Sequence, residues 1–326
     1  MSITIALAGD TMLGRGVADE IEEAGPDGLF SAEVRELFSS ADLGVLNLEC
    51  CISRRGRPWD GPEKMFHFRA PPQAVDALTA LGVDCVTLAN NHALDYGEIA
   101  LADTLASLSA AGIAVTGAGA DVGQARAPAI LRAQGLTVAV LGLTDHPADF
   151  AATADLPGVR YVDLRTGAPA DLALEVRAIA EASDVLVVMP HWGPNMTIGP
   201  MPYIRSAARS FTQAGATLVA GSSAHLFHGV AGQVIYDLGD FIDDYMIDDT
   251  LRNDLGLLYL VTMDRRALTR IEAVPLRLRY ARTELAAGAD RAWILARFRK
   301  ACAALGTSVR VQDGRLVAEP GAEPPG

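Results

Sequence analysis

Short apolar runs alternate with longer amphipathic segments through most of the chain. The apolar runs have the length of strands and predict β-strands at residues 3–8, 43–48, 85–89, 114–117, 137–143, 185–190, 218–220, 234–236 and 257–263. Segments in which apolar residues recur every three or four positions predict helices at residues 32–38, 72–81, 98–111, 171–182, 202–214 and 291–305. Strands that alternate with helices in this way are typical of an α/β fold with parallel central strands and antiparallel additions.

Some stretches depart from this alternation. Residues 127–143, interrupted at Gln134-Gly135, could form a hairpin, and so could the late strands. Residues 52–69 form a polar insertion, and the composition of residues 319–326, rich in proline, glycine and glutamate, predicts disorder. We therefore expect a main domain at residues 1–285, followed at residues 286–326 by a C-terminal helix and a disordered tail.

Polar motifs stand where the predicted strands end. They are Gly9-Asp10, Asn47-Leu48-Glu49, Asn90-Asn91-His92, His191-Trp192-Gly193, Gly221-Ser222-Ser223-Ala224-His225 and Asp237-Leu238-Gly239-Asp240. Such side chains are poor core material, because a buried polar group needs a partner. The carboxyl ends of parallel strands, however, are where α/β folds place their binding sites. The pattern therefore predicts that the motifs meet in one cleft.

Composition narrows the class of partner. The net charge of −13 argues against nucleic acid and anionic membrane surfaces, since both need a basic face. No apolar run reaches the roughly 18 residues of a membrane-spanning helix, and the first residues lack the basic region of a signal peptide. The four cysteines show no CxxC spacing, which favours reduced thiols and a cytoplasmic location. Nothing in these patterns predicts an oligomeric state.

The ordered motifs resemble a known family. Gly9-Asp10-Thr11-Met12-Leu13-Gly14-Arg15 and the later motifs, together with Asp95-Tyr96-Gly97 and Tyr236 to Phe241, are similar to the CapA-type proteins, named for poly-γ-glutamate capsule synthesis. These proteins belong to the calcineurin-like metallophosphoesterase superfamily. The resemblance implies a calcineurin-like α/β sandwich of mixed sheets flanked by helices, with the main domain as the catalytic one, and a metal centre at the strand ends.

The departures from the superfamily pattern change the expected metal. Met12 stands where a ligand histidine is usual, and Ser223 replaces the histidine that would accompany His225. Glu49 takes the bridging position. The remaining set is rich in oxygen, which favours Ca²⁺, Mg²⁺ or Mn²⁺ over zinc or iron. We expect one hard divalent ion and no organic cofactor, with metal ligands Asp10, Glu49 and Asn91.

Three kinds of chemistry stay open at this stage. Phosphoester hydrolysis is common in the superfamily but uses two metal ions, and each metal position here has lost an imidazole. Amide chemistry on polyglutamate is the second. The third is epimerisation of a peptide Cα, which needs an acid and a base on opposite faces. A non-enzymatic peptide-binding module is a further alternative.

The histidine-rich motifs favour epimerisation. The expected catalytic residues are His92, Asp95, His191, His225, His228 and Asp240. His228 and Asp240 replace the glutamine and asparagine that are usual in the capsule-type pattern, and both changes add capacity for proton transfer. The chain looks like a cytosolic branch that epimerises the carboxy-terminal residue of lasso-peptide precursors. The alternative is a CapA-like hydrolase that acts on a γ-glutamyl, other amide or phosphoester bond.

A basic patch in the polar insertion indicates the kind of substrate. Its candidate binding residues are Arg54, Arg57, Trp59 and Arg69. Guanidinium groups can bind carboxylates through two parallel hydrogen bonds. We therefore expect the insertion to help bind an anionic or carboxylate-bearing peptide.

Overall fold

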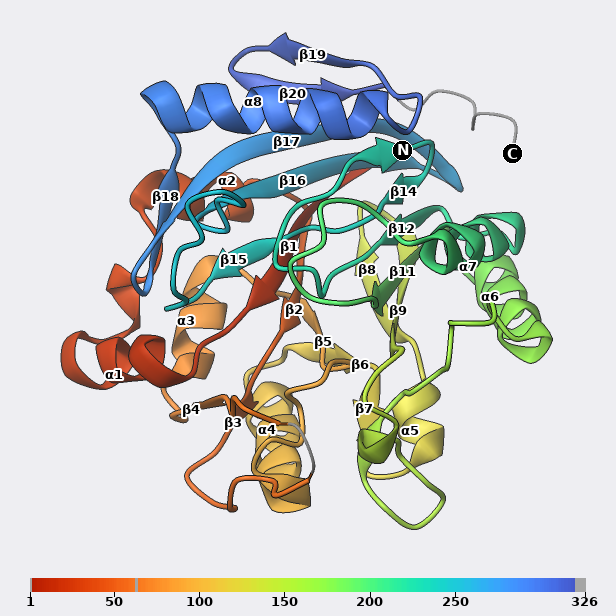
Figure 1. Ribbon diagram of the computed structural model, residues 1–326. Coiled ribbons are helices and arrows are strands. Elements are labelled where there is room, and N and C mark those ends of the chain that lie inside the picture. Colours follow the sequence, from red (N-terminus) through yellow and green to blue (C-terminus); the bar gives the residue numbers. More distant parts are fainter. Residues whose placement is uncertain (1, 62–63, 320–326) are drawn as a thin grey trace.

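Two mixed β-sheets stand at the centre of the molecule (Figure 1). The computed structural model describes residues 2–61 and 64–319. The main path of the larger sheet runs β19 (Val309–Gln312), β20 (Arg315–Ala318), β17 (Ala267–Arg279), β16 (Leu255–Asp264), β1 (Ser2–Thr11), β2 (Leu43–Leu48), β5 (Cys85–Thr87) and β6 (Ala114–Thr116). Two further strands join it, β15 (Asp240–Ile242) on β1 and β18 (Arg282–Leu285) on β17.

The smaller sheet carries the second half of the site. Its order is β13 (Val230–Ala231), β14 (Val234–Ile235), β12 (Leu218–Ala220), β11 (Val185–His191), β9 (Leu136–Thr144) and β8 (Ala129–Ala133). Short pairs also form between β3 (Cys51–Ile52) and β4 (Arg69–Ala70), and between β7 (Ala118–Gly119) and β10 (Gly158–Val159).

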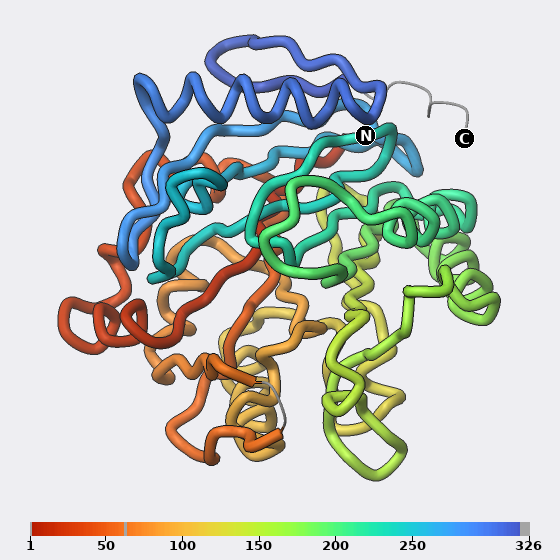
Figure 2. Tube along the Cα trace, in the orientation of Figure 1, coloured from red at the N-terminus to blue at the C-terminus, as the bar shows by residue number. Residues whose placement is uncertain are grey.

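Helices flank the two sheets. They are α1 (Arg15–Ala24), α2 (Ala32–Ser39), α3 (Ala74–Leu81), α4 (Gly97–Ala110), α5 (Val122–Arg126), α6 (Ala170–Ala182), α7 (Pro202–Gln213) and α8 (Gly288–Ala303), with 3₁₀ turns at Pro26–Gly28 and Ala148–Phe150. The Cα trace shows α6 and α7 together outside the smaller sheet, and α8 along β17 with the β19–β20 hairpin beyond it (Figure 2).

Three apolar cores explain this layering. One lies between the sheets and contains Ile5 of β1 and Val187 of β11. A second packs the larger sheet against α1 to α4, and a third packs the smaller sheet against α6 and α7. Alternating side chains of one strand therefore serve two cores, as when Ile5 faces the other sheet and Ala6 faces the helices. The result is an α/β sandwich of mixed sheets flanked by helices.

The predicted elements form where the apolar pattern is strong. Each predicted strand and helix is present with its ends shifted by at most a few residues, and the predicted hairpin at residues 127–143 is β8 antiparallel to β9. The prediction missed α1, whose buried residues are only Gly16, Val17 and Ile21. It also missed β17, in which charged residues such as Arg270 and Glu272 occupy partly exposed positions. A short apolar stripe gives too weak a periodicity to be recognised.

The predicted domain boundary at residue 285 falls between β18 and α8. Beyond it, Ile294, Phe298 and Cys302 of α8 join the core between the sheets. Strand β20 pairs with β17, so residues 309–318 extend the larger sheet. Most of the tail predicted to be disordered, residues 320–326, lies outside the described residues. Over residues 2–61 and 64–319, none of the helices has the length and hydropathy needed to cross a membrane.

Candidate metal centre and active site

Asp10 lies at the point where the two sheets meet. It is in β1, which pairs in parallel with β2 on one side and with β15 on the other. The Asp10 amide donates to the Gly239 carbonyl over 2.9 Å. A Cβ atom on Gly9 would lie 1.9 Å from that same oxygen, so the residue before Asp10 must be glycine. The carboxylate is buried and accepts hydrogen bonds from Asn47 Nδ2 (2.7 Å) and the Ser223 amide (3.2 Å).

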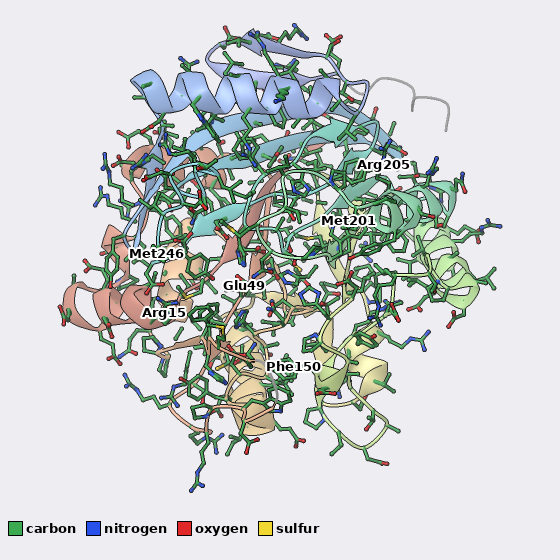
Figure 3. The ribbon with its side chains drawn as sticks, in the orientation of Figure 1. Arg15, Glu49, Phe150, Met201, Arg205 and Met246 are labelled. Carbon is green, nitrogen blue, oxygen red and sulfur yellow. The ribbon has the colours of Figure 1, made fainter. Side chains whose placement is uncertain are left out.

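Two groups of side chains around Asp10 have the spacing of metal ligands. In each group, Asp10 with Glu49 and His191 or Asp10 with His225 and Asp240, the donor atoms lie within 4.8 Å of one another. Asn91 extends the first group, because its Oδ1 lies 3.1 Å from His191 Nε2. The structure thus brings together the predicted ligands Asp10, Glu49 and Asn91 and adds His191 to them. Figure 3 labels Glu49 near the middle of the molecule.

The donor set fits a divalent cation. Glu49 Oε1 and Asp240 Oδ2 are buried and have no hydrogen-bond partner within the described part of the chain. Burial raises the pKa of both carboxyl groups well above their usual values. Buried carboxylates without partners are costly, and a bound cation is one of the few groups that compensate them. Because the two groups share Asp10, they offer two adjacent positions; whether one ion binds or two stays a prediction.

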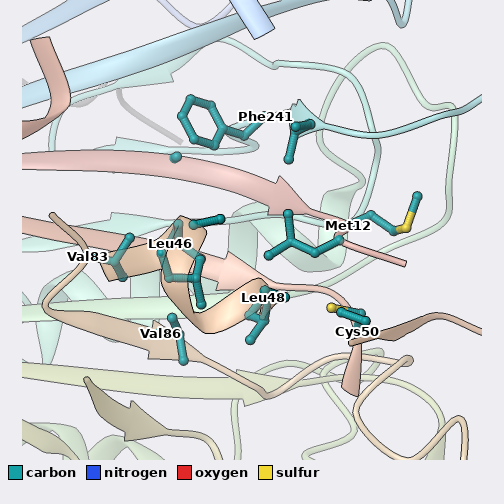
Figure 4. Packing of buried hydrophobic residues seen from close by; sticks show 14 of the residues in the cluster. Met12, Leu46, Leu48, Cys50, Val83, Val86 and Phe241 are labelled. Carbon is teal, nitrogen blue, oxygen red and sulfur yellow. The ribbon is translucent and has the colours of Figure 1, made fainter. Parts of the chain in front are cut away.

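Met12 and Ser223, which replace two usual ligands, have other contacts. Met12 packs with Leu48 and Cys50 in the core beneath α1 to α4 (Figure 4), and its sulfur accepts a hydrogen bond from the Gly14 amide. The Ser223 hydroxyl donates to the Gly193 carbonyl over 2.9 Å. These contacts leave the ligand set rich in oxygen, as the sequence predicts.

His92 and Asp95 form one imidazole–carboxylate pair. His92 Nδ1 lies 2.6 Å from Asp95 Oδ2, which also accepts a hydrogen bond from the Phe68 amide. Asp95 Oδ1 pairs with Lys64 Nζ at 2.7 Å, and the Phe68 ring stacks on His92 at 3.9 Å. Burial, followed by the charge of Lys64, lowers the pKa of His92 well below its usual value. The turn from Asn91 to Asp95 therefore holds His92 by its Nδ1, in surroundings that disfavour the protonated imidazole.

His225 and Asp240 form a second pair where the two sheets meet, because His225 follows β12 of the smaller sheet and Asp240 begins β15 of the larger one. His225 Nδ1 lies 2.8 Å from Asp240 Oδ1 and 3.5 Å from Asp10 Oδ2. Burial lowers the pKa of His225, but the surrounding carboxylates of Asp240, Glu49 and Asp10 outweigh it and raise this pKa well above its usual value. The loop holds two non-glycine residues at positive φ, Ser223 (113°) and His225 (58°). Such strain persists only where neighbouring contacts enforce it.

Those contacts come from Asp237. Its carboxylate accepts the Ala224 amide at 2.9 Å and the Gly239 amide at 2.9 Å, so it braces the loop and does not orient a histidine. Asp240, in contrast, lies against His225 and orients its ring.

Both imidazoles line one cavity. Its volume is about 350 Å³, and its lining residues are Arg15, Phe66, Phe68, His92, Asn195, Met196, His225, Tyr245, Met246 and Asn253. Phe68, which stacks on His92, lies 5.8 Å from the ring of Tyr245, and Tyr245 lies 5.3 Å from the ring of His225. The two histidines are therefore joined by an aromatic wall within a cavity of the size that small substrates occupy.

The remaining predicted residues are placed differently. His228 is buried, and its Nε2 donates to the Thr197 carbonyl at 2.8 Å; it belongs to neither ligand group. Trp59 packs edge-on against Phe150. Arg54 pairs with Glu22 at 2.9 Å, whereas Arg69 lines a second cavity beside the first.

Sequence reasoning gave no role to four residues that the structure places here. Asn47 links Asp10 to Asn90 through its amide. The hydroxyl of Tyr245 donates to Glu49 Oε2 over 3.4 Å, and Lys64 binds the Asn91 carbonyl as well as Asp95. His146, paired with Asp145 at 2.5 Å, has its ring 5.3 Å from that of His191. Asn47 could have been predicted, because it precedes Glu49 in one of the motifs. The positions of the other three residues depend on tertiary contacts that the sequence pattern does not indicate.

Comparison with known proteins gives a family and a fold. The sequence profile described as "Bacterial capsule synthesis protein PGA_cap" matches residues 4–245. A probable polyglutamine synthesis accessory protein of Mycobacterium tuberculosis is 30% identical, over 90% of this chain and 89% of that protein. The PGA biosynthesis protein CapA of Bacillus subtilis is 30% identical over 74% of this chain and 63% of that protein.

A solved structure supports the expected architecture. A phosphatase from Mycoplasma pneumoniae, described as novel, matches with a TM-score of 0.50 and 13% identity, over 85% of this chain and 94% of that one. The likeness shows the fold alone, the calcineurin-like metallophosphoesterase sandwich that the motifs predict.

Proposed function

The chain belongs to the PGA_cap family of bacterial capsule synthesis proteins, and from this premise we propose that it is a metal-dependent peptide epimerase. The observation that carries the proposal is the pair of carboxylate-bound imidazoles, His92 with Asp95 and His225 with Asp240, that line one cavity beside the ligand groups. Family and fold are consistent with a metal-dependent enzyme. The specific reaction that we propose, inversion at a peptide Cα, is supported by the arrangement of the two imidazoles.

Epimerisation requires that a proton leave one face of Cα and that another arrive on the opposite face. In each pair the carboxylate binds Nδ1, so Nε2 is the nitrogen left to exchange a proton. Asp10, Glu49, Asn91 and His191 would hold the divalent ion, which when bound supplies positive charge for the oxyanion of the deprotonated substrate. The rings of Phe68 and Tyr245 would exclude water from the part of the cavity that lies between the two imidazoles.

The resemblance suggests the substrate. We propose a ribosomal peptide, with the C-terminal residue of a lasso-peptide precursor as the expected site of inversion in the cytoplasm. The relatives named for polyglutamate or polyglutamine synthesis indicate the alternative, cleavage of a γ-glutamyl, other amide or phosphoester bond by the same residues.

Deuterium exchange tests the proposal. The metal-loaded protein is incubated in deuterated water with matched peptides that carry an L or a D residue at the C-terminus, and mass spectrometry locates any gain of one mass unit. We expect exchange at a single Cα that chelator removes and metal restores. Because two bases serve opposite faces, His92→Gln should abolish exchange with one enantiomer and spare part of it with the other.

The alternative chemistry has its own readouts. An aryl phosphate and a γ-linked glutamate oligomer are offered to the same preparation. Metal-dependent cleavage of either, with no exchange at Cα in any peptide, would replace the epimerase with a hydrolase.

A further inference from the structure

A second cavity adjoins the catalytic one and shares Arg15 with it. Its volume is about 380 Å³, and its walls include Arg15, Arg54, Arg69, Tyr96, Asp19 and Glu22. We propose that this cavity binds one carboxylate of the substrate through Arg15 and Arg69, next to the reacting residue. The identity of that substrate as a peptide rests on the proposed function. The carboxylate subsite itself rests on the contacts of Arg15 and Arg69.

Arg69 is available for an anion. It begins β4, and its guanidinium lies 4.1 Å from the centroid of the Tyr96 ring. Its one hydrogen bond among the described residues is a long contact of 3.5 Å to the Arg55 carbonyl, and no described carboxylate lies within ion-pair distance. A guanidinium stacked on an aromatic face keeps its edge free for two parallel hydrogen bonds to a carboxylate.

Arg15 is held in a similar way at the boundary between the cavities. Its guanidinium lies over the rings of Phe66 (5.5 Å) and Phe68 (6.0 Å), both of which line the catalytic cavity. Asp244 pairs with Nε at 3.2 Å, and the two terminal nitrogens of Arg15 make no hydrogen bond to a described residue. The Arg15 backbone has a φ of 52°, a strained conformation for a side-chain-bearing residue. Figure 3 shows Arg15 beside Met246 on the side of the molecule that faces away from α7.

The charges of this cavity match a single negative group. Arg54 is engaged by Glu22 at 2.9 Å and by Gln73, and Asp19 adds another negative charge. Because Asp244 also pairs with Arg15, Arg69 is the one arginine of this cavity that pairs with no described carboxylate. A polyanion would meet Asp19 and Glu22 as well as the arginines. A single carboxylate at Arg69 would bind a guanidinium group that no described acid occupies.

Binding measurements test the subsite without any need for turnover. The probes are N-acetyl-trialanyl-leucine with a free carboxylate, the same peptide as its amide, and a γ-linked tetraglutamate, each titrated into metal-loaded protein by calorimetry. We expect the acid to bind at least tenfold more tightly than the amide. Arg69→Gln and Arg15→Gln should each remove most of this preference, and Arg69→Lys should keep part of it.

Arg209→Gln is the matched control, because it removes the same charge from the exposed face of α7. It should leave the preference for the acid intact, and thermal melting confirms that each variant is folded. Equal or undetectable binding of acid and amide at millimolar concentration overturns the proposal, as does an acid preference that survives Arg69→Gln. Tenfold tighter binding of tetraglutamate than of the acid peptide overturns the assignment to a single carboxylate.

The two proposals fail separately. An acid preference that depends on Arg69, without deuterium exchange at Cα, would reject the epimerase and keep the subsite. Exchange at Cα with no discrimination between acid and amide would reject the subsite alone.

Discussion

The two imidazole–carboxylate pairs of the site have opposite surroundings. His92 is next to the ammonium group of Lys64 and beneath the ring of Phe68, both supplied by the polar insertion. His225 is next to the carboxylates of Asp10 and Asp240 at the meeting point of the two sheets. The pKa of His92 is consequently lowered by burial and Lys64, whereas the carboxylates raise that of His225 against the effect of burial.

The two pairs therefore depend on different parts of the chain. The surroundings of His92 come from the polar insertion outside the two sheets, so a change of sequence in that insertion can alter them without altering the sheets. The His225 side depends on strand ends and a strained loop, so it is tied to the fold and to the ligand groups. Substitutions that affect one side should leave a different signature from those that affect the other.

The largest effect is expected at Asp10, which belongs to both ligand groups. Asp10→Ala should lose bound metal and reduce activity about a thousandfold, because a metal ion supplies several kcal/mol of transition-state stabilisation. Elemental analysis and the exchange assay measure the two losses on one sample. Full metal content with unchanged activity would contradict the assignment of Asp10.

The two orienting aspartates sharpen the comparison. Asp95→Asn and Asp240→Asn should each slow turnover by about a hundredfold, because each frees an imidazole from its partner. Only Asp240→Asn should also weaken metal binding, since Asp240 shares a ligand group with Asp10, which also holds the ion in the first group, and Asp95 is in neither group. Calorimetric metal titration of the two variants measures this difference, and equal weakening by both substitutions would show that the two pairs do not differ in their link to the metal.

His228 should influence the pH dependence of stability and not the chemistry. Burial lowers its pKa to about 4, assisted by the charge of Arg297, and its Nδ1 has no hydrogen-bond partner among the described residues. The unfolded chain takes up a proton near pH 6.5 that the folded chain refuses until about pH 4, so this residue costs stability as pH falls through that window.

The expected size is about 2 kcal/mol between pH 7 and pH 5. Other buried acids also titrate, so the measurement is the difference in unfolding free energy between the native protein and His228→Gln at each pH. A difference that does not vary with pH would disprove this explanation.

Lys64 should have the smallest effect. Lys64→Met removes the cation from Asp95 and the Asn91 carbonyl, and about a tenfold fall in kcat with little change in KM is expected. Lys64→Arg should keep part of the kcat that Lys64→Met loses, because it keeps the positive charge. A purely structural role of Lys64 would instead lower the melting temperature of both variants. Metal content should stay at the native level.

The sequence identifies those parts of the site that follow strands. Asp10, Glu49 and His191 could be predicted together because each ends an apolar run, and parallel strands bring such ends to one edge. The partner of Asp240 and the role of Asp237 could not be predicted, since both aspartates follow the same strand within a few residues. The structure separates them by backbone path: one accepts loop amides and the other reaches His225.

The positions of side chains in loops could not be predicted from the sequence pattern. Lys64 and Tyr245 lie in irregular segments whose route depends on the rest of the fold, and no periodicity marks where their side chains point. Arg15 illustrates the same limit, because it is part of a recognised motif yet its place between two cavities depends on Phe66 and Phe68. Local pattern predicts which residues are buried together, not how loops meet over them.

The central position of β1 has a consequence for biosynthesis. This first strand pairs with β2, which follows soon after, but also with β15 and β16, which are made more than 200 residues later. Contacts so distant in sequence form slowly, because a long loop must close before they are made. On a nascent chain the second ligand group therefore cannot form before Asp240 of β15 has been made, whereas the residues of the first group are all present once His191 has been made.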